Sequence, residues 1–325
     1  MSFILQKRTM GFKIESTPYT AEASVDWNIP FEDITYDPDL KQMSRKVARG
    51  HYSKVDPSIT GKRLFKFGMK VALAYSGTAA TPPSYFPVLR ACGMKQVIAT
   101  GVTLTPHADY SNVPATVWIN ERDEGTAPSV LQFKLRGCMG NPTIELNNVG
   151  EPVYIKFDFQ GVLVSIADVA FASIINPSAF DATLPDALLG ATLKAFAEVQ
   201  TANKVTINLN NKIELFTDPS AAEGVQGAHI VDRDPTIAMD PDLALIATQG
   251  DYSRLTGNST GTFSMTIGSH ITLSTVSLQL NKAYKPGNRE GHVTNEKEYS
   301  LRGTVGNDEF SIVQAYIIAA NWPPG

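Results

Sequence analysis

The sequence has little of what metalloproteins, redox proteins and membrane proteins need. Only two of its 325 residues are cysteines, Cys92 and Cys138, and their separation fits neither a metal-ligand nor a redox spacing. We therefore expect both to be small buried apolar residues. No stretch approaches the ~18 consecutive apolar residues of a membrane span, and the apolar run near the N-terminus is too short for a signal peptide. These absences predict a chain with no membrane partner, made and kept in a reducing cytoplasm.

Motifs that carry catalysis or cofactor binding are equally scarce. The five histidines are scattered, without metal-ligand spacing, and no phosphate-binding glycine loop is present. Residues 257–261 match G-x-S-x-G, but a strand pattern follows them where a hydrolase needs a helix. Residues 37–39 and 232–235 resemble calcium-loop fragments that lack the distal glutamate, so turns are expected there. We expect no enzyme, no cofactor and no metal site.

A basic excess is also missing from the chain as a whole, which argues against a strong nucleic-acid binder. The net charge is −4, from 28 basic and 32 acidic side chains. The charge is unevenly placed, because residues 41–70 hold nine basic side chains and one acidic, a net +8, which leaves −12 for the rest. A basic segment on an acidic body suits self-assembly through complementary faces, although a solvated basic loop fits the same pattern.

What the sequence does have is a core and many strand patterns. Apolar residues make up 43% of the chain and charged residues 18%, enough to bury a core. In residues 130–136, for example, Leu131, Phe133 and Leu135 alternate with polar residues, which is typical of a half-buried antiparallel strand. The segments with such patterns are Leu64–Leu73, Thr116–Arg122, Val130–Arg136, Val153–Val164, Val205–Phe216, Thr262–Ile267, Ile271–Leu280 and Glu298–Val305.

Helix patterns are few. Pro83–Gly93 is bounded by prolines and a glycine, and Pro241–Gly250 has Asp240 as its expected N-cap and Pro241 at its first position. Residues 182–202 are helix-prone by composition and lie between two strand-rich regions, so we interpret them as linker.

The order of elements around the two helices indicates an internal repeat. In each half an Asp-Pro and a polar segment precede a strand, a helix and two further strands. Each half then closes on an aromatic-polar-apolar-polar-Gly motif, at Phe157–Gly161 and Tyr299–Gly303. We predict a mainly β protein of two tandem antiparallel β-sandwich or barrel domains, each with one short helix. The first domain spans 1–165, the linker 166–203, and the second domain 204–325 with a C-terminal arm from Asn307.

Several segments resemble the tail tube (major tail) proteins of long-tailed, non-contractile bacteriophages. The most specific likeness is a strand that ends in a small-residue loop with prolines, residues 72–83 (ALAYSGTAATPP), followed by residues 87–93 (PVLRACG). Residues 231–235 (VDRDP), 157–161 (FDFQG) and 303–309 (GTVGNDE) are similar to other parts of that family, so the likeness extends from about residue 11 to 312.

The resemblance implies a structural role in the virion tail, after assembly in the host cytoplasm. Subunits would form rings that stack into a tube, and DNA would pass non-specifically through the lumen during ejection. Because such rings hold six tube domains, a duplicated chain implies homotrimeric, pseudo-hexameric rings, with a homohexamer as the alternative. Tail terminator, distal tail and tape measure proteins are the other implied partners.

A lumen that conducts DNA should be acidic or neutral, because cationic walls bind phosphate. We therefore assign the basic segment to contacts between rings or subunits. A long arm is expected over Asp39–Thr60, with Pro219–Val231 as its shorter counterpart. The expected contact residues are Lys41, Arg45, Lys46, Arg49, His51, Lys54, Asp232, Arg233, Asp234 and Asp308.

Two other classes of protein stay open. A tail terminator or distal tail protein usually carries one tube-like domain, so the repeat argues against it. A carbohydrate-binding or adhesive β-sandwich would need clustered aromatic residues, whereas Trp27, Trp118 and Trp322 are dispersed in the sequence.

Overall fold

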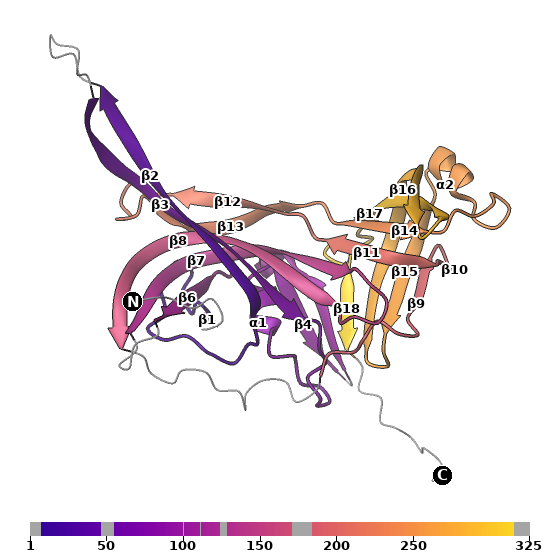
Figure 1. The fold of residues 1–325 in the computed structure, drawn as a ribbon, viewed down its shortest axis with the longest axis horizontal. Coiled ribbons are helices and arrows are strands. Elements are labelled where there is room, and N and C mark those ends of the chain that lie inside the picture. Colours follow the sequence, from indigo (N-terminus) through magenta and orange to yellow (C-terminus); the bar gives the residue numbers. More distant parts are fainter. Residues whose placement is uncertain are drawn as a thin grey trace.

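The structure is a computed structural model that describes residues 8–46, 55–99, 101–110, 112–123, 129–170 and 184–314. We refer to residues 8–170 as the first half and to residues 184–314 as the second half. Antiparallel strands dominate both halves, and each half has one short helix (Figure 1). The predicted mainly β fold class is therefore confirmed.

The described part of the first half has eight strands, the helix α1 and a 3-10 turn over Ala108–Tyr110. The strands are β1 (Thr9–Ile14), β2 (Glu32–Lys46), β3 (Val55–Ala72), β4 (Met94–Ile98), β5 (Val102–Pro106), β6 (Ala115–Arg122), β7 (Ser129–Leu146) and β8 (Tyr154–Ala170). Helix α1 (Phe86–Arg90) lies inside the predicted Pro83–Gly93 and buries Phe86, Val88 and Leu89.

The second half has ten strands and the helix α2 (Asp251–Gly257). The strands are β9 (Thr192–Ala195), β10 (Glu198–Val199), β11 (Ala202–Asn208), β12 (Asn211–Thr217), β13 (Val225–Arg233), β14 (Thr236–Pro241), β15 (Thr260–Ile267), β16 (Ile271–Arg289), β17 (His292–Arg302) and β18 (Ser311–Gln314).

The two halves pair their main strands in the same order. The first half runs β1-β6-β7-β8-β3-β2 and the second half β9-β15-β16-β17-β14-β11, with every neighbouring pair antiparallel. In both, the strand before the helix pairs with the last long strand. This correspondence supports the predicted repeat, although the tandem domains and their boundaries stay a prediction.

The halves are joined into one sheet at two places. Residues Thr143–Leu146 of β7 pair with Val205–Asn208 of β11, and we call this junction the β7–β11 seam. Strand β18 forms the second junction, since it pairs with β16 of its own half and with β5 of the first half. The predicted C-terminal arm therefore begins as a strand within the chain, at least over Ser311–Gln314; its last residues, 315–325, lie outside the described residues.

The apolar rows of the strands form one continuous core across both halves. In the first half its centre is aromatic: the rings of Phe67 and Phe159 stack with centroids 5.1 Å apart, and Phe12 meets Phe159 edge-on at 5.8 Å. Cys92 and Cys138 are fully buried free thiols, as predicted. Burial raises the pKa of both thiols, so they stay protonated and apolar.

The second predicted helix is wrong in position. Asp240 and Pro241 end strand β14, and the helix begins ten residues later, at Asp251. The reason is long-range: the Asp240 carboxylate accepts hydrogen bonds from the backbone N–H groups of Asn203 (3.1 Å) and Lys204 (2.7 Å), so it holds the start of β11 and does not cap a helix. Helix α2 ends at Asn258, which adopts the left-handed conformation as its C-cap.

Residues 182–202, interpreted as a linker of helix-prone composition, contain strands in their described part. Strands β9 and β10 lie there, and β9 pairs with β15. The tertiary pairing overrides the helix-prone composition, because β9 covers the edge of β15 as β1 covers β6. The single strand predicted over Val205–Phe216 is two strands, separated at Asn210, which has a positive φ of 49°.

Candidate assembly surfaces

The predicted arm is a two-stranded β-ribbon that leaves the body of the molecule (Figure 1). It consists of the distal parts of β2 and β3, paired from Asp39–Leu64 out to Lys46–Val55. Its exposed side chains include Leu40, Met43 and Ile59, with exposed fractions of 41%, 56% and 49%. Exposed apolar groups on a projecting ribbon favour contact with another molecule. We call residues 39–60 the arm.

The predicted basic contact residues fall on or beyond this ribbon. Lys41 is exposed on β2, and the backbones of Arg45 and Lys46 pair with those of Asp56 and Val55. The other three, Arg49, His51 and Lys54, lie outside the described residues.

Strands β12 and β13 form a second, shorter ribbon, which packs on the first half (Figure 1). Ala228 and Ile230 of β13 bury against Met139 of β7 in a small apolar cluster on the side of the sheet opposite the main core. The Asn211 side-chain amide fixes the base of this ribbon, because it donates to the carbonyls of Cys92 (2.8 Å) and Gly140 (3.0 Å). The predicted counterpart of the arm is thus held within its own chain.

Close backbone approach and an ion pair hold the tip of the short ribbon. Gly137 has a φ of +59°, and a Cβ placed on it would lie 2.6 Å from the Cα of Gly227. The adjacent Arg136 pairs with Glu223 at 2.8 Å and donates to the Tyr19 carbonyl at 2.6 Å. Only glycines allow the two backbones to lie this close.

The predicted residues near the end of the short ribbon act within the chain. Arg233 lies 3.5 Å from Glu309 and 3.2 Å from Asn307, so it ties β13 to the loop before β18. Asp308 accepts hydrogen bonds from the Thr304 backbone and hydroxyl, which lower its pKa. Asp232 and Asp234 are exposed. The structure therefore gives Arg233 and Asp308 intrachain roles, and their contact with other subunits stays a prediction.

The joined sheet has a polar face, by which we mean the side opposite the main apolar core. Three of its lysines lie beside carboxylates from neighbouring strands. Lys156 lies 2.7 Å from Glu145 and Lys282 lies 2.5 Å from Glu298, while Lys285 pairs with Glu296. Burial acts to raise the pKa of Glu145, but hydrogen bonds from Lys156 and Asn147 outweigh it and lower that pKa. The positive charges of these three lysines on the polar face are therefore offset by neighbouring carboxylates.

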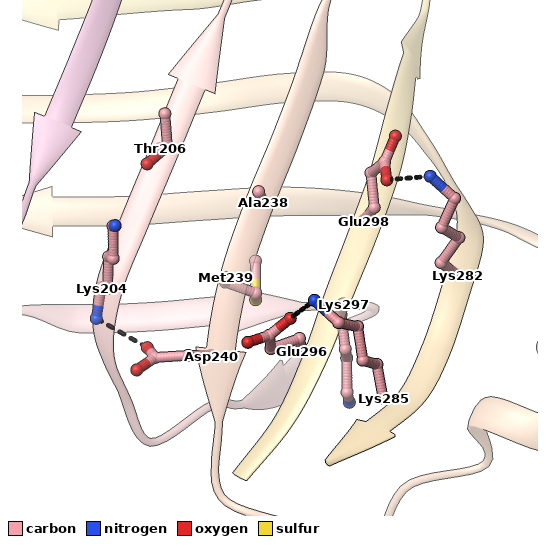
Figure 2. A pocket seen from close by; sticks show the side chains of 10 residues that line it. All are labelled: Lys204, Thr206, Ala238, Met239, Asp240, Lys282, Lys285, Glu296, Lys297 and Glu298. Atoms are coloured by element: carbon pink, nitrogen blue, oxygen red, sulfur yellow. Dashed lines mark hydrogen bonds and ion pairs between the residues drawn. The ribbon is translucent and has the colours of Figure 1, made fainter. Parts of the chain in front are cut away.

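A cleft of about 490 Å³ lies on this part of the sheet. Figure 2 shows that β11, β14, β17 and the bent end of β16 line it, with Lys282 turned toward Glu298. The bend follows from two register shifts between Leu280 and Lys285, which carry the end of β16 out of line with the rest of the strand.

Sequence reasoning missed one buried ionic group under α2. The ammonium of Lys297 is fully buried, 2.6 Å from the Asp251 carboxylate and 2.8 Å from Gln249 Oε1. Burial lowers the pKa of Lys297. The sequence did indicate that Lys297 is buried, because every second residue of β17 is buried and Lys297 lies in the same row as Tyr299 and Leu301. This pair fastens the helix to the sheet, and Lys297 also contributes to the lining of the cleft.

Among the described residues, no group of three or more histidine, cysteine or acidic side chains could hold a metal ion. No helix in that part of the chain is long and apolar enough to cross a membrane. No protein-family model matches the chain, and no curated protein matches it significantly.

Proposed function

We propose that this protein is the structural subunit of a bacteriophage tail tube and not an enzyme. Its copies form closed rings, the rings stack, and DNA passes along the lumen during ejection. The observation that carries the proposal is the shared pairing order of the two halves and their union in one sheet through the β7–β11 seam. A wall built from repeated domains joined edge to edge is what a ring requires.

The charge distribution supports the same function. DNA slides along a wall only when that wall does not bind phosphate strongly. On the polar face, Lys156, Lys282 and Lys285 each have a carboxylate beside them, which offsets their positive charges. We assign the polar face to the lumen.

The arm supplies the contact between rings. It carries exposed apolar groups and belongs to the most basic segment of an acidic chain. We propose trimeric, pseudo-hexameric rings, with hexameric rings as the alternative, in the tail of the virion. Tail terminator, distal tail and tape measure proteins are the expected partners, and assembly takes place in the host cytoplasm.

Negative-stain microscopy of the purified protein tests the function. Stacked rings or tubes are the expected result. Single rings that never stack would favour a terminator or distal tail protein, and monomers at high concentration would favour an adhesive or carbohydrate-binding β-sandwich; either contradicts the proposal.

Deletion of residues 41–58 tests the role of the arm. We expect soluble rings or monomers that do not polymerise, since the contact between rings is gone while the body of the fold is intact. The control replaces Val149 and Val305, which are exposed loop residues outside the arm, with serine, and it should form normal tubes. Tubes of normal length from the deletion variant would show that the arm does not join rings.

A further inference from the structure

The β7–β11 seam has a specific place on β7. One edge of β7 pairs with β6 as far as Cys138. Beyond that point the same edge accepts β11, with Thr143 opposite Asn208 and Leu146 opposite Val205. The other edge of β7 pairs with β8 throughout. A strand of the second half thus fills an edge that the first half leaves open.

Strand β16 of the second half has the same open edge. It pairs with β15 as far as Gln279 and continues to Arg289, with β17 on its other edge. Beyond Gln279, no strand within the described ranges pairs with the edge of β16 that β15 occupies up to that residue. Leu280 faces Tyr299 as Pro142 faces Phe157.

The two closing motifs, Phe157–Gly161 and Tyr299–Gly303, therefore align the open edge of β7 with the open edge of β16. Beyond Leu280 the register of β16 shifts, so the match follows the partners on β17 and β8. Lys282, opposite Glu298, corresponds to Thr143, opposite Lys156. Residues Thr143–Leu146 are those of β7 that accept β11.

The strand that matches β11 is β2. It pairs with β3 as β11 pairs with β14. Thr35 of β2 lies opposite Gly68 of β3, and Gly68 lies opposite Asp158 of β8. In the second half, Asn208 of β11 lies opposite Thr236 of β14, and Thr236 lies opposite Ser300 of β17. Thr35 is thus the counterpart of Asn208. In the part of the chain that the structure describes, β2 ends the sheet and pairs with β3 alone.

We propose that the open edge of β2 in one copy pairs antiparallel with the open edge of β16 in the next copy, with Thr35 opposite Lys282. This contact repeats between copies the β7–β11 seam that joins the halves within a copy. It rests on the proposed ring-forming function and names the surfaces that close the ring.

Side-chain chemistry at the two edges supports this register. In the β7–β11 seam, the Asn141 amide donates to Asn208 Oδ1 at 2.8 Å. The counterparts of these residues are Gln279 and Thr35. In the proposed contact, the side-chain amide of Gln279 donates to the Thr35 hydroxyl of the next copy in the same way.

Both edges are irregular, with register shifts and positive φ values at Asp33 and Tyr284. The Ile34 carbonyl also accepts a hydrogen bond from Arg8. Irregular edges discourage pairing with unrelated strands, so they favour a matched partner.

The geometry makes the contact head-to-tail. In the sheet, β17, β14, β11, β7, β8 and β3 separate β16 from β2, so the two edges lie on different parts of one copy. Two different surfaces that meet between identical chains generate a ring or an open filament.

A cysteine cross-link tests the register. Opposed residues of antiparallel strands have Cα atoms about 4.5–5.5 Å apart, which suits a disulfide. Thr35→Cys and Lys282→Cys place thiols at exposed positions, whereas the native Cys92 and Cys138 are buried. After mild oxidation of assembled protein, the double variant should run as covalent oligomers on a non-reducing gel, and reduction should return monomers.

Three controls define the result. An equimolar mixture of the two single-cysteine variants should give covalent dimers and nothing larger, and each single variant alone should stay monomeric on the gel. The matched pair Thr143→Cys with Asn208→Cys, inside the β7–β11 seam, should form a disulfide within one chain.

The outcomes separate this inference from the function on which it rests. Rings or tubes under the microscope without a cross-link in the double variant would overturn the β2–β16 contact and leave the tail-tube function standing. Wild-type protein that forms neither rings nor tubes would overturn both.

Discussion

At the scale of single residues, buried polar groups connect segments that are distant in sequence. Glu15 follows β1, and its Oε1 accepts hydrogen bonds from the Gly137 backbone (2.7 Å) and the Thr116 hydroxyl (3.1 Å). Its other oxygen is buried without a hydrogen-bond partner among the described residues. Burial raises the pKa of Glu15, with the hydrogen bonds acting against it. The carboxyl group is therefore costly in its charged form.

Glu15 should make stability depend on pH. The folded protein holds its proton to a higher pH than the unfolded chain does, because the folded pKa lies above the ordinary value of 4.5. Between these two pKa values the native state binds more protons, so the contribution of Glu15 to the free energy of unfolding falls as pH rises. Glu15→Gln lacks this titration.

Urea unfolding of both proteins between pH 4.5 and neutral pH checks this expectation. We expect the variant to gain stability relative to the wild type as pH rises. A stability difference that does not change with pH would contradict a raised pKa.

Residue types predict burial better than they predict partners. The isolated cysteines were predicted as buried, and Cys92 and Cys138 are buried. Asp240, predicted to begin a helix, holds the backbone of β11. Lys297, which lies in an apolar row, has its partner Asp251 on α2, 46 positions earlier in the chain. Local sequence patterns carry no information on such distant partners.

At the scale of elements, the short ribbon β12–β13 should be sensitive to a single added methyl group. A Cβ on Gly227 would lie 2.2 Å from Tyr19 Cδ1 and 3.0 Å from the Gly137 Cα. Gly227→Ala should therefore lower the free energy of unfolding by about 1–3 kcal/mol, the usual range for overpacking. Chemical denaturation measures the loss.

Gly61→Ala is the matched control, because Gly61 is also a strand glycine but the nearest atoms to its Cβ lie at 3.5 Å. It should change stability little. Equal effects of the two variants would mean that the close contact of the short ribbon does not matter to the fold.

Strands were easier to predict than helices in this chain. Alternating segments such as Thr116–Arg122 and Thr262–Ile267 match β6 and β15 closely, because one buried face imposes a period of two. Helix α2 has seven residues and only one buried side chain, Asp251, so it offers no apolar stripe to detect. Pro241 resembled a helix start, but it ends a strand.

At the scale of the whole molecule, the order of elements indicated a repeat, but the sheet that joins the halves could not be predicted. The β7–β11 seam links residues about sixty positions apart in sequence, and β18 reaches β5 from the other end of the chain. Such pairings depend on the completed fold. The same holds for the polar face, whose ion pairs form only after distant strands become neighbours.

The charge balance of the polar face gives a prediction for the assembled tube. Glu296→Gln with Glu298→Gln would remove the carboxylates beside Lys282 and Lys285 and raise the net charge by two per chain. If this face lines the lumen, tubes of the double variant should retain double-stranded DNA at low salt, and the retention should weaken steeply as salt increases.

A quadruple variant that also carries Lys282→Gln and Lys285→Gln is the matched control, since it keeps the neutral side chains and loses the unpaired ammonium groups. It should release DNA as the wild type does. Co-sedimentation of tubes with DNA over a salt series measures the difference. Equal retention by the wild type and both variants would place the DNA path away from the polar face, because unpaired lysines along that path must raise its affinity for phosphate.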